Sequence, residues 1–208
     1  MGSRAGVRVK VCGVTSVEQA VACLEAGVDA IGVNLVPSSP RRVSVEVARD
    51  VAKEVGSRAL VVAVVSNLSV PAMLAVRSGT GVECLQLHGD ETADEVQALL
   101  PHAYKAGRIG GPADVEALAS MPGDYVLADT RVEGASGGTG LSFDWSLVAE
   151  LATRRRLVLA GGLTPGNVVA AIGACHPWCV DVASGVESRP GVKDMGLVKA
   201  FVEAARGG

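Results

Sequence analysis

The stretch RVKVCGVTSVEQAVACLEAGVDAIGVNL, residues 8–35, contains the unit that decides the fold. It opens with an apolar run of strand length, Arg8–Cys12, continues with a helical segment, Ser16–Glu25, and returns to an apolar run, Ala30–Leu35. Apolar strands joined through a helix are typical of a parallel sheet whose faces are covered by helices. The number of times that this unit recurs along the chain then decides the architecture.

The alternation continues to the C-terminal part of the chain. Strands are predicted at Arg8–Cys12, Ala30–Leu35, Ala59–Val65, Glu83–Leu87, Ala103–Ala106, Tyr125–Ala128, Leu157–Ala160 and Cys179–Val182. Helices are predicted at Ser16–Glu25, Ser44–Glu54, Val70–Arg77, Thr92–Leu100, Pro112–Ala119, Asp144–Leu151, Pro165–Gly173 and Asp194–Ala205. Start signals support several helices: Ser16 and Ser44 stand at their beginnings, and Pro165 follows Thr164 at a first helical position.

Eight strand–helix units in 208 residues leave about 26 residues for each unit. Eight units are the number found in a (β/α)8 TIM barrel. The alternative is an open doubly wound sheet, which usually has a Gly-rich fingerprint after its first strand, and Cys12-Gly13-Val14-Thr15 does not match it. No linker or low-complexity segment interrupts the series, so we predict an α/β fold with one (β/α)8 barrel domain over residues 1–208.

Composition and charge argue against several classes of function. Apolar residues make up 49% of the chain and charged residues 20%, as in an ordinary globular protein. A formal net charge of −3 argues against a nucleic-acid partner, which would require a basic face. The longest apolar run, Ala59–Val65, is much shorter than the ~20 residues of a membrane span. Residues 1–8 contain no long apolar stretch, so no secretory signal is expected.

The five cysteines also indicate a compartment. They are odd in number and stand mostly in apolar segments, which argues against a disulfide framework and favours a reducing cytoplasm. Cys175 and Cys179 can be considered as metal ligands, but no second cysteine pair and no nearby histidine pair completes a site. We therefore expect no metal at these cysteines.

Polar side chains stand where the predicted strands end. In a (β/α)8 barrel the active site lies at the C-terminal ends of the strands, whereas aliphatic side chains fill the interior below. Each polar residue taken alone can equally well belong to a solvated loop. Together around one rim they indicate a site, and they are Cys12, Asn34, Gln86, His88, Asp129 and Asp181.

Two of these residues have side chains suited to acid–base chemistry. Cys12 shares a strand face with Lys10, a cation that could lower the pKa of the thiol and make it a base. The alternative for Cys12 is a small buried apolar residue. Asp129 follows an apolar strand, where a partly desolvated carboxyl can serve as a general acid, or can simply cap the following turn.

Glycine-containing turns after the last two strands predict an anion site. Gly161-Gly162 follows the seventh strand and Ser184-Gly185 the eighth, and barrels often bind phosphate with the loops at these positions. Residues 137–140, Gly-Gly-Thr-Gly, form either a lid or a flexible connection. Arg41, in the loop after the second strand, can bind a carboxylate, whereas its neighbour Arg42 is expected to be solvated.

The sequence resembles phosphoribosylanthranilate isomerase of tryptophan biosynthesis along nearly its whole length. The order and spacing of several short stretches make this resemblance specific. They are KVCGVT (10–15), SPR (39–41), QLHG (86–89), GGTG (137–140) with FDW (143–145), LAGGL (159–163), VDVASGVE (180–187), PG (190–191) and KD (193–194).

The resemblance implies an Amadori rearrangement of N-(5-phosphoribosyl)anthranilate that needs one acid and one base and no cofactor. It implies that Cys12 is the base and Asp129 the acid, and that Arg41 holds the anthranilate carboxylate. Gln86, His88 and Asp181 would lie around the ribose, and Gly161, Gly162, Ser184 and Gly185 around the phosphate. The implied partner is a small phosphorylated substrate, and the chain can be a monomer or a homodimer.

The sequence departs from the family in the aromatic residues near the site. Members often have an aromatic residue in the second strand and at the end of the third, where this chain has Gly32-Val33-Asn34-Leu35 and Ala63-Val64-Val65. The packing of the anthranilate ring, and with it the breadth of substrates, is therefore left open. Two other functions were considered: another phosphate-binding barrel enzyme, such as a metal-dependent epimerase or a lyase, and a non-catalytic barrel that binds a phosphorylated ligand.

Overall fold

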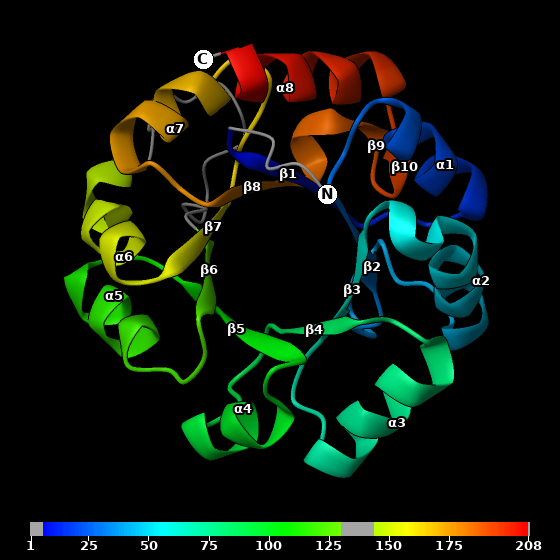
Figure 1. The fold of residues 1–208 in the computed structure, drawn as a ribbon, viewed down its shortest axis with the longest axis horizontal. Coiled ribbons are helices and arrows are strands. Elements are labelled where there is room, and N and C mark those ends of the chain that lie inside the picture. Colours follow the sequence, from blue (N-terminus) through cyan, green and yellow to red (C-terminus); the bar gives the residue numbers. More distant parts are fainter. Residues whose placement is uncertain (1–5, 130–143, 208) are drawn as a thin grey trace.

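The computed structural model describes residues 6–129 and 144–207. Eight parallel strands form a closed barrel in the order of the sequence, and β8 pairs with β1 to close it (Figure 1). The fold predicted from the sequence is confirmed. The strands are β1 (Arg8–Cys12), β2 (Ala30–Asn34), β3 (Leu60–Val65), β4 (Cys84–Leu87), β5 (Ala103–Arg108), β6 (Tyr125–Asp129), β7 (Arg156–Ala160) and β8 (Cys179–Val182).

A ring of helices surrounds the barrel (Figure 1). The helices are α1 (Val17–Glu25), α2 (Val45–Val55), α3 (Val70–Thr80), α4 (Ala93–Leu99), α5 (Pro112–Ala119), α6 (Ala149–Arg154), α7 (Val168–Cys175) and α8 (Met195–Gly207). The expected caps are present, since Ser16 and Ser44 accept hydrogen bonds from the backbone N–H groups of Gln19 and Val47. Within the described segments, no helix has the length and apolar character needed to cross a membrane.

The alternation of side chains along each strand divides the core into two parts. Val61 and Ala63 of β3 belong to the large apolar cluster that joins the strands to the helices. Val62, between them, belongs to a smaller cluster that fills the barrel interior together with Leu127 and Val158. Because neighbouring strands keep their register, interior positions of different strands fall at the same depth. Polar residues at the strand ends are thereby brought to one rim.

After β8 the structure contains three short elements that were not predicted from the sequence. A short 3-10 helix, η3 (Ser184–Val186), is followed by a two-stranded hairpin, β9 (Glu187–Arg189) and β10 (Val192–Lys193), before α8 begins. The sequence analysis gave no element to these residues, because the strands are only two and three residues long. This hairpin carries two charged side chains of the site described below.

Two α-helices begin several residues later in the chain than predicted. The helix expected at Asp144 begins as a 3-10 helix, η2 (Trp145–Val148), and becomes α6 at Ala149. The helix expected at Pro165 begins at Val168. The side chain of Asn167 accepts a hydrogen bond from the backbone N–H of Thr164 and donates one to the carbonyl of Gly162, so these residues form a turn ahead of the helix.

Candidate active site

One pocket opens at the C-terminal ends of the strands. It encloses about 650 Å³ of space, part of which is open to solvent. Nine of the ten residues assigned to the site from the sequence line it: Cys12, Arg41, Gln86, His88, Asp129, Gly161, Gly162, Asp181 and Ser184. The tenth, Gly185, follows Ser184 in η3 and is not a lining residue.

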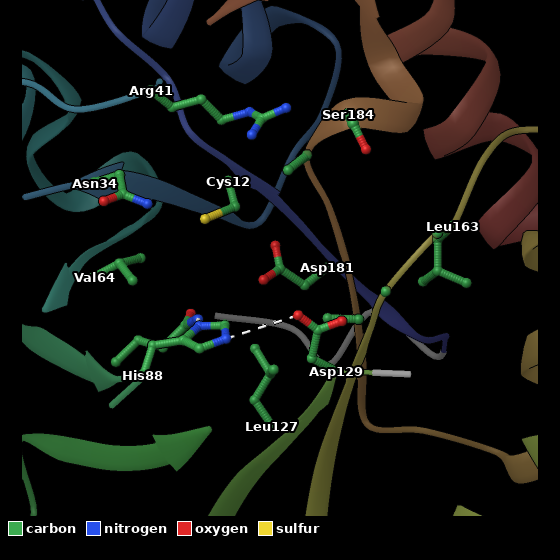
Figure 2. A pocket seen from close by; sticks show the side chains of 15 residues that line it. Cys12, Asn34, Arg41, Val64, His88, Leu127, Asp129, Leu163, Asp181 and Ser184 are labelled. Carbon is green, nitrogen blue, oxygen red and sulfur yellow. Dashed lines mark hydrogen bonds and ion pairs between the residues drawn. The ribbon is translucent and has the colours of Figure 1, made fainter. Parts of the chain in front are cut away.

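The thiol of Cys12 and the carboxyls of Asp129 and Asp181 are turned toward the same space (Figure 2). Cys12 is the last residue of β1, Asp129 ends β6, and Asp181 lies in β8. Strand alternation explains this convergence, since each side chain occupies an interior position at the rim of the barrel.

Cys12 packs closely against the neighbouring strand. A Cβ atom at Gly32 of β2 would lie 2.8 Å from Cys12 Sγ, so glycine at this position makes room for the thiol. Burial raises the pKa of the Cys12 thiol above its ordinary value, although Lys10 and Lys193 lower it in part. Lys10 lowers the pKa of the thiol, as the sequence predicted, but burial raises that pKa by more.

A buried ion pair lies beneath Cys12. Lys10 Nζ donates to Asp181 Oδ2 at 2.7 Å and to Gln86 Oε1 at 3.0 Å. Burial raises the pKa of Asp181 despite the attraction of Lys10. Asp181 Oδ1 is buried and accepts no hydrogen bond from the residues that the structure describes. This oxygen is therefore an acceptor at the pocket wall, and a ligand hydroxyl would satisfy it.

Gln86 and His88 connect this pair to Asp129. Gln86 Nε2 lies 2.9 Å from His88 Nδ1, and His88 Nε2 lies 3.7 Å from Asp129 Oδ2 (Figure 2). Burial lowers the pKa of His88, although the charge of Asp129 raises it in part. The direction of this shift favours the neutral form of His88, whose ring is directed at the carboxyl expected to act as the acid.

Arg41 is held by a carboxylate of its own chain. Its Nε donates to Glu187 Oε1 at 2.8 Å and its Nη2 to Glu187 Oε2 at 2.6 Å. Hydrogen bonds from Arg41 and Lys193 keep the pKa of Glu187 below its ordinary value, although burial opposes this effect. Lys193 Nζ also donates to the carbonyls of Cys12, at 2.6 Å, and Ala183, at 3.1 Å. The hairpin that holds Glu187 and Lys193 is thus tied to β1.

The sequence analysis missed Glu187 and Lys193 as site residues. Both stand in stretches that carry the family resemblance, 180–187 and 193–194, and that is the one signal that pointed to them. Neither residue ends a predicted strand, so the search for polar strand ends did not include them.

Two loops with exposed backbone lie on the side of β7 and β8. Gly161 and Gly162 have φ angles of +96° and +66°, which a residue with a side chain rarely adopts. A Cβ atom at Gly185 would collide with the carbonyl oxygen of Leu163, so the loop after β8 packs directly on the loop after β7. The Gly-Gly-Thr-Gly segment, residues 137–140, lies outside the described residues.

The positions that lack the family's aromatic residues lie at the pocket. Asn34 of β2 and Val64 of β3 are lining residues, whereas Val65 packs outward in the apolar core. For metals, the described ranges 6–129 and 144–207 contain no group of three or more His, Cys, Asp or Glu side chains that could hold an ion.

Comparisons with known proteins identify the family of the chain. The family model described as "N-(5'phosphoribosyl)anthranilate (PRA) isomerase" matches residues 9–204. The N-(5'-phosphoribosyl)anthranilate isomerase of Myxococcus xanthus is 44% identical over 204 residues, which is 96% of each chain. The crystal structure of phosphoribosyl anthranilate isomerase from Thermotoga maritima is 38% identical, with a TM-score of 0.88 over 97% of this chain and 99% of that one.

Two further structures bear on ligand and assembly. One phosphoribosyl anthranilate isomerase, solved in complex with reduced 1-(o-carboxyphenylamino)-1-deoxyribulose 5-phosphate, is 36% identical, with a TM-score of 0.86 over 97% of this chain and 99% of that one. Another describes monomers generated from the dimeric Thermotoga maritima enzyme and is 35% identical, with a TM-score of 0.83 and the same coverage. The chain therefore belongs to the family of N-(5'-phosphoribosyl)anthranilate isomerases and is an isomerase of tryptophan biosynthesis.

Proposed function

We propose that Cys12 is the general base and Asp129 the general acid of an Amadori rearrangement in this pocket. The observation that carries the proposal is the convergence of the two side chains, from β1 and β6, on one cavity (Figure 2). A thiol and a carboxyl on different strands can address two different atoms of one sugar, which is what an acid–base isomerisation requires.

The reaction then proceeds in three balanced steps. Asp129 gives its proton to the ribose ring oxygen, the bond from that oxygen to C1 breaks, and a protonated Schiff base forms between C1 and the anthranilate nitrogen. Cys12, as the thiolate, takes the proton from C2, and the electron pair of that bond makes a C1=C2 double bond and neutralises the nitrogen. The enolamine gains a proton at C1 and loses one from the C2 hydroxyl, which gives the ketone. Exchange with water returns the proton to Asp129 and removes it from Cys12.

Arg41 is our proposed contact for the anthranilate carboxylate. Glu187 occupies the edge of the guanidinium formed by Nε and Nη2. The substrate would therefore meet the other edge, formed by Nη1 and the second hydrogen of Nη2. A guanidinium fixed on one edge is already oriented, so little side-chain entropy is lost when a carboxylate binds to the other.

Other lining residues of the pocket are our proposed contacts for the phosphate and the ribose. We assign the phosphate to the backbone around Gly161, Gly162, Ser184 and Gly185, where glycine lets an anion approach the chain closely. Asp181 Oδ1 is suited to a ribose hydroxyl because it is a buried acceptor. We assign Gln86 and His88, which also line the pocket, to the ribose as well. Pinning both charged ends of the substrate would hold C2 near the thiol, and such positioning contributes to the rate.

A direct assay tests this function. Purified protein should convert N-(5-phosphoribosyl)anthranilate, with loss of the fluorescence of the substrate, at a rate that EDTA leaves unchanged. No conversion by correctly folded protein would contradict the proposal. A rate that falls in EDTA and recovers with a divalent cation would contradict the cofactor-free acid–base mechanism.

For location and assembly we propose a cytoplasmic enzyme that is a monomer or a homodimer. All five cysteines are free, which suits a reducing compartment. The acid–base pair and the proposed substrate contacts all come from one chain, which is compatible with either assembly. Sedimentation at several protein concentrations would distinguish the two assemblies.

A further inference from the structure

The amide of Gln86 has a single orientation that satisfies its neighbours. Its Oε1 lies 3.0 Å from Lys10 Nζ and 2.9 Å from the hydroxyl of Tyr104 on β5. An ammonium group has only donors, so the amide atom that faces Lys10 must be the oxygen. Tyr104, buried in the barrel interior, supplies a second donor to the same oxygen. The nitrogen of the amide must then point the other way.

That nitrogen faces His88 and decides which ring nitrogen carries the proton. Gln86 Nε2 lies 2.9 Å from His88 Nδ1, and an amide nitrogen only donates. Nδ1 must therefore be the unprotonated acceptor, and the proton of the neutral imidazole is on Nε2. Nε2 is the atom that faces Asp129 Oδ2, at 3.7 Å.

We propose that Gln86, oriented by Lys10 and Tyr104, fixes the tautomer of His88 so that an N–H group, and not a lone pair, faces Asp129. Gln86 is thus a positioning residue that acts through His88. This inference rests on the proposed role of Asp129 as the acid. In that role the tautomer offers no lone pair that could take the proton of the acid, and its N–H group supplies a donor to the carboxylate once the ring oxygen has taken that proton.

The other tautomer would compete for the acid's proton. Free imidazole is a stronger base than a carboxylate by about 2.6 pH units, so a bare Nε2 beside Asp129 would accept its proton. With Nε2 protonated and Nδ1 engaged by Gln86, His88 has no free lone pair to offer. This arrangement therefore prevents His88 from taking the proton of Asp129.

The charges around His88 allow the neutral ring. Asp129 of β6 and Asp181 of β8 favour its protonation, whereas Lys10 of β1 and Lys105 of β5 oppose it. Burial is the largest effect and lowers the pKa of His88. The direction of this shift favours the neutral ring, and the hydrogen bond to Gln86 then sets its tautomer.

Nitrogen NMR of the wild-type protein labelled with ¹⁵N-histidine tests the inference directly. His102 and His176, in the loops before β5 and β8, serve as references in the same spectrum. At neutral pH, His88 should show an unprotonated Nδ1 and a protonated Nε2. A proton on Nδ1, or an imidazolium, would overturn the inference. Because this readout does not involve turnover, it is independent of whether Asp129 is the acid.

Gln86→Glu replaces the amide donor that faces His88 Nδ1 with a carboxylate acceptor of nearly the same size. A carboxylate would attract a proton to Nδ1, so His88 should become an imidazolium at neutral pH. We expect kcat to fall about tenfold at neutral pH, because the imidazolium stabilises the ionised form of Asp129. It should not recover as the pH rises, because the proton that stays on the ring is held on Nδ1 by the introduced carboxylate and a lone pair on Nε2 then faces Asp129. An unchanged His88 spectrum together with unchanged kcat in a folded variant would contradict the inference.

Two tyrosine variants complete the test. Tyr104→Phe removes one of the two donors to Gln86 Oε1 and should lower kcat about two- to threefold, because Lys10 still holds the amide. Tyr125→Phe is the matched control, since its hydroxyl contacts Arg156 at the other end of the barrel, and it should leave kcat and the His88 spectrum unchanged. Equal effects of the two variants would assign the loss to packing and would overturn the role of Tyr104.

Discussion

Glu187 holds Arg41 by two parallel hydrogen bonds of 2.8 and 2.6 Å, one to Nε and one to Nη2. The two residues are far apart in the sequence, in the loop after β2 and in the hairpin after β8. A Cβ atom at Gly13 would strike the Arg41 side chain, so the guanidinium stem also lies directly over the end of β1. Glu187 therefore orients the cation that we assign to the substrate carboxylate.

Glu187→Gln is expected to raise KM more than it lowers kcat. The amide keeps one acceptor and loses the charge, so Arg41 is no longer fixed along one edge and Lys193 loses its ion-pair partner. We expect KM to rise about tenfold and the free energy of unfolding to fall by about 3 kcal/mol, the scale of removing one partner of a buried pair. Steady-state kinetics and urea unfolding measure the two effects. Unchanged KM in a stable variant would exclude the positioning role.

Removing either proposed acid–base group should leave a folded but slow enzyme. Cys12→Ser and Asp129→Asn should each lower kcat by about 10²-fold or more, the scale of acid–base contributions. The matched control is Cys84→Ser on β4, which faces a different cavity at the N-terminal end of the barrel and should keep wild-type kcat. Full activity in Cys12→Ala would refute the role of the thiol.

The free enzyme should require alkaline pH to ionise Cys12. Burial raises the pKa of its thiol, so the thiolate forms only above the ordinary value of about 8.5. We expect the rate of Cys12 alkylation by iodoacetamide, and kcat/KM, to rise with pH through this range. Peptide mass spectrometry would locate the modified cysteine. A plateau already reached near pH 7 would show that Lys10 and Lys193 outweigh burial.

Gly185→Ala should damage phosphate binding. Its Cβ would meet the carbonyl oxygen of Leu163, and the backbone has to move to relieve the contact. We expect KM, and the inhibition constant of inorganic phosphate, to rise about tenfold or more. Gly173→Ala in α7 is the control, since nothing lies within 4 Å of its Cβ, and it should gain up to about 1 kcal/mol of stability. Equal phosphate inhibition in both variants would contradict the assignment of this loop.

The site residues at the strand ends could be predicted from the sequence because their positions depend on local rules. Alternation along a strand predicts that Gln86 and His88 share a face, and parallel strands place their C-terminal ends on one rim. Cys12, Asp129 and Asp181 meet at the pocket for the same reason. These relationships need only the period of the strand and the direction of the sheet.

The remaining features depend on contacts between distant segments. The bonds of Glu187 to Arg41 and of Lys193 to the Cys12 carbonyl span 146 and 181 residues, and no local pattern indicates them. The contact between Gln86 and Tyr104 depends on the register of β4 and β5. The start of α7 was misplaced because Thr164-Pro165 is a good local signal, whereas the side chain of Asn167 decides the turn.

The hydrogen bond from Lys193 to the carbonyl of Cys12 also bears on when the protein becomes active during its synthesis. Lys193, which binds the end of the first strand, follows all eight barrel strands in the sequence and is therefore translated after them. A nascent chain in which β8 has already paired with β1 still lacks the hydrogen bond from Lys193 to the carbonyl beside the thiol. We therefore expect turnover only once the hairpin of β9 and β10 has been synthesised and Lys193 has bound the carbonyl beside the thiol.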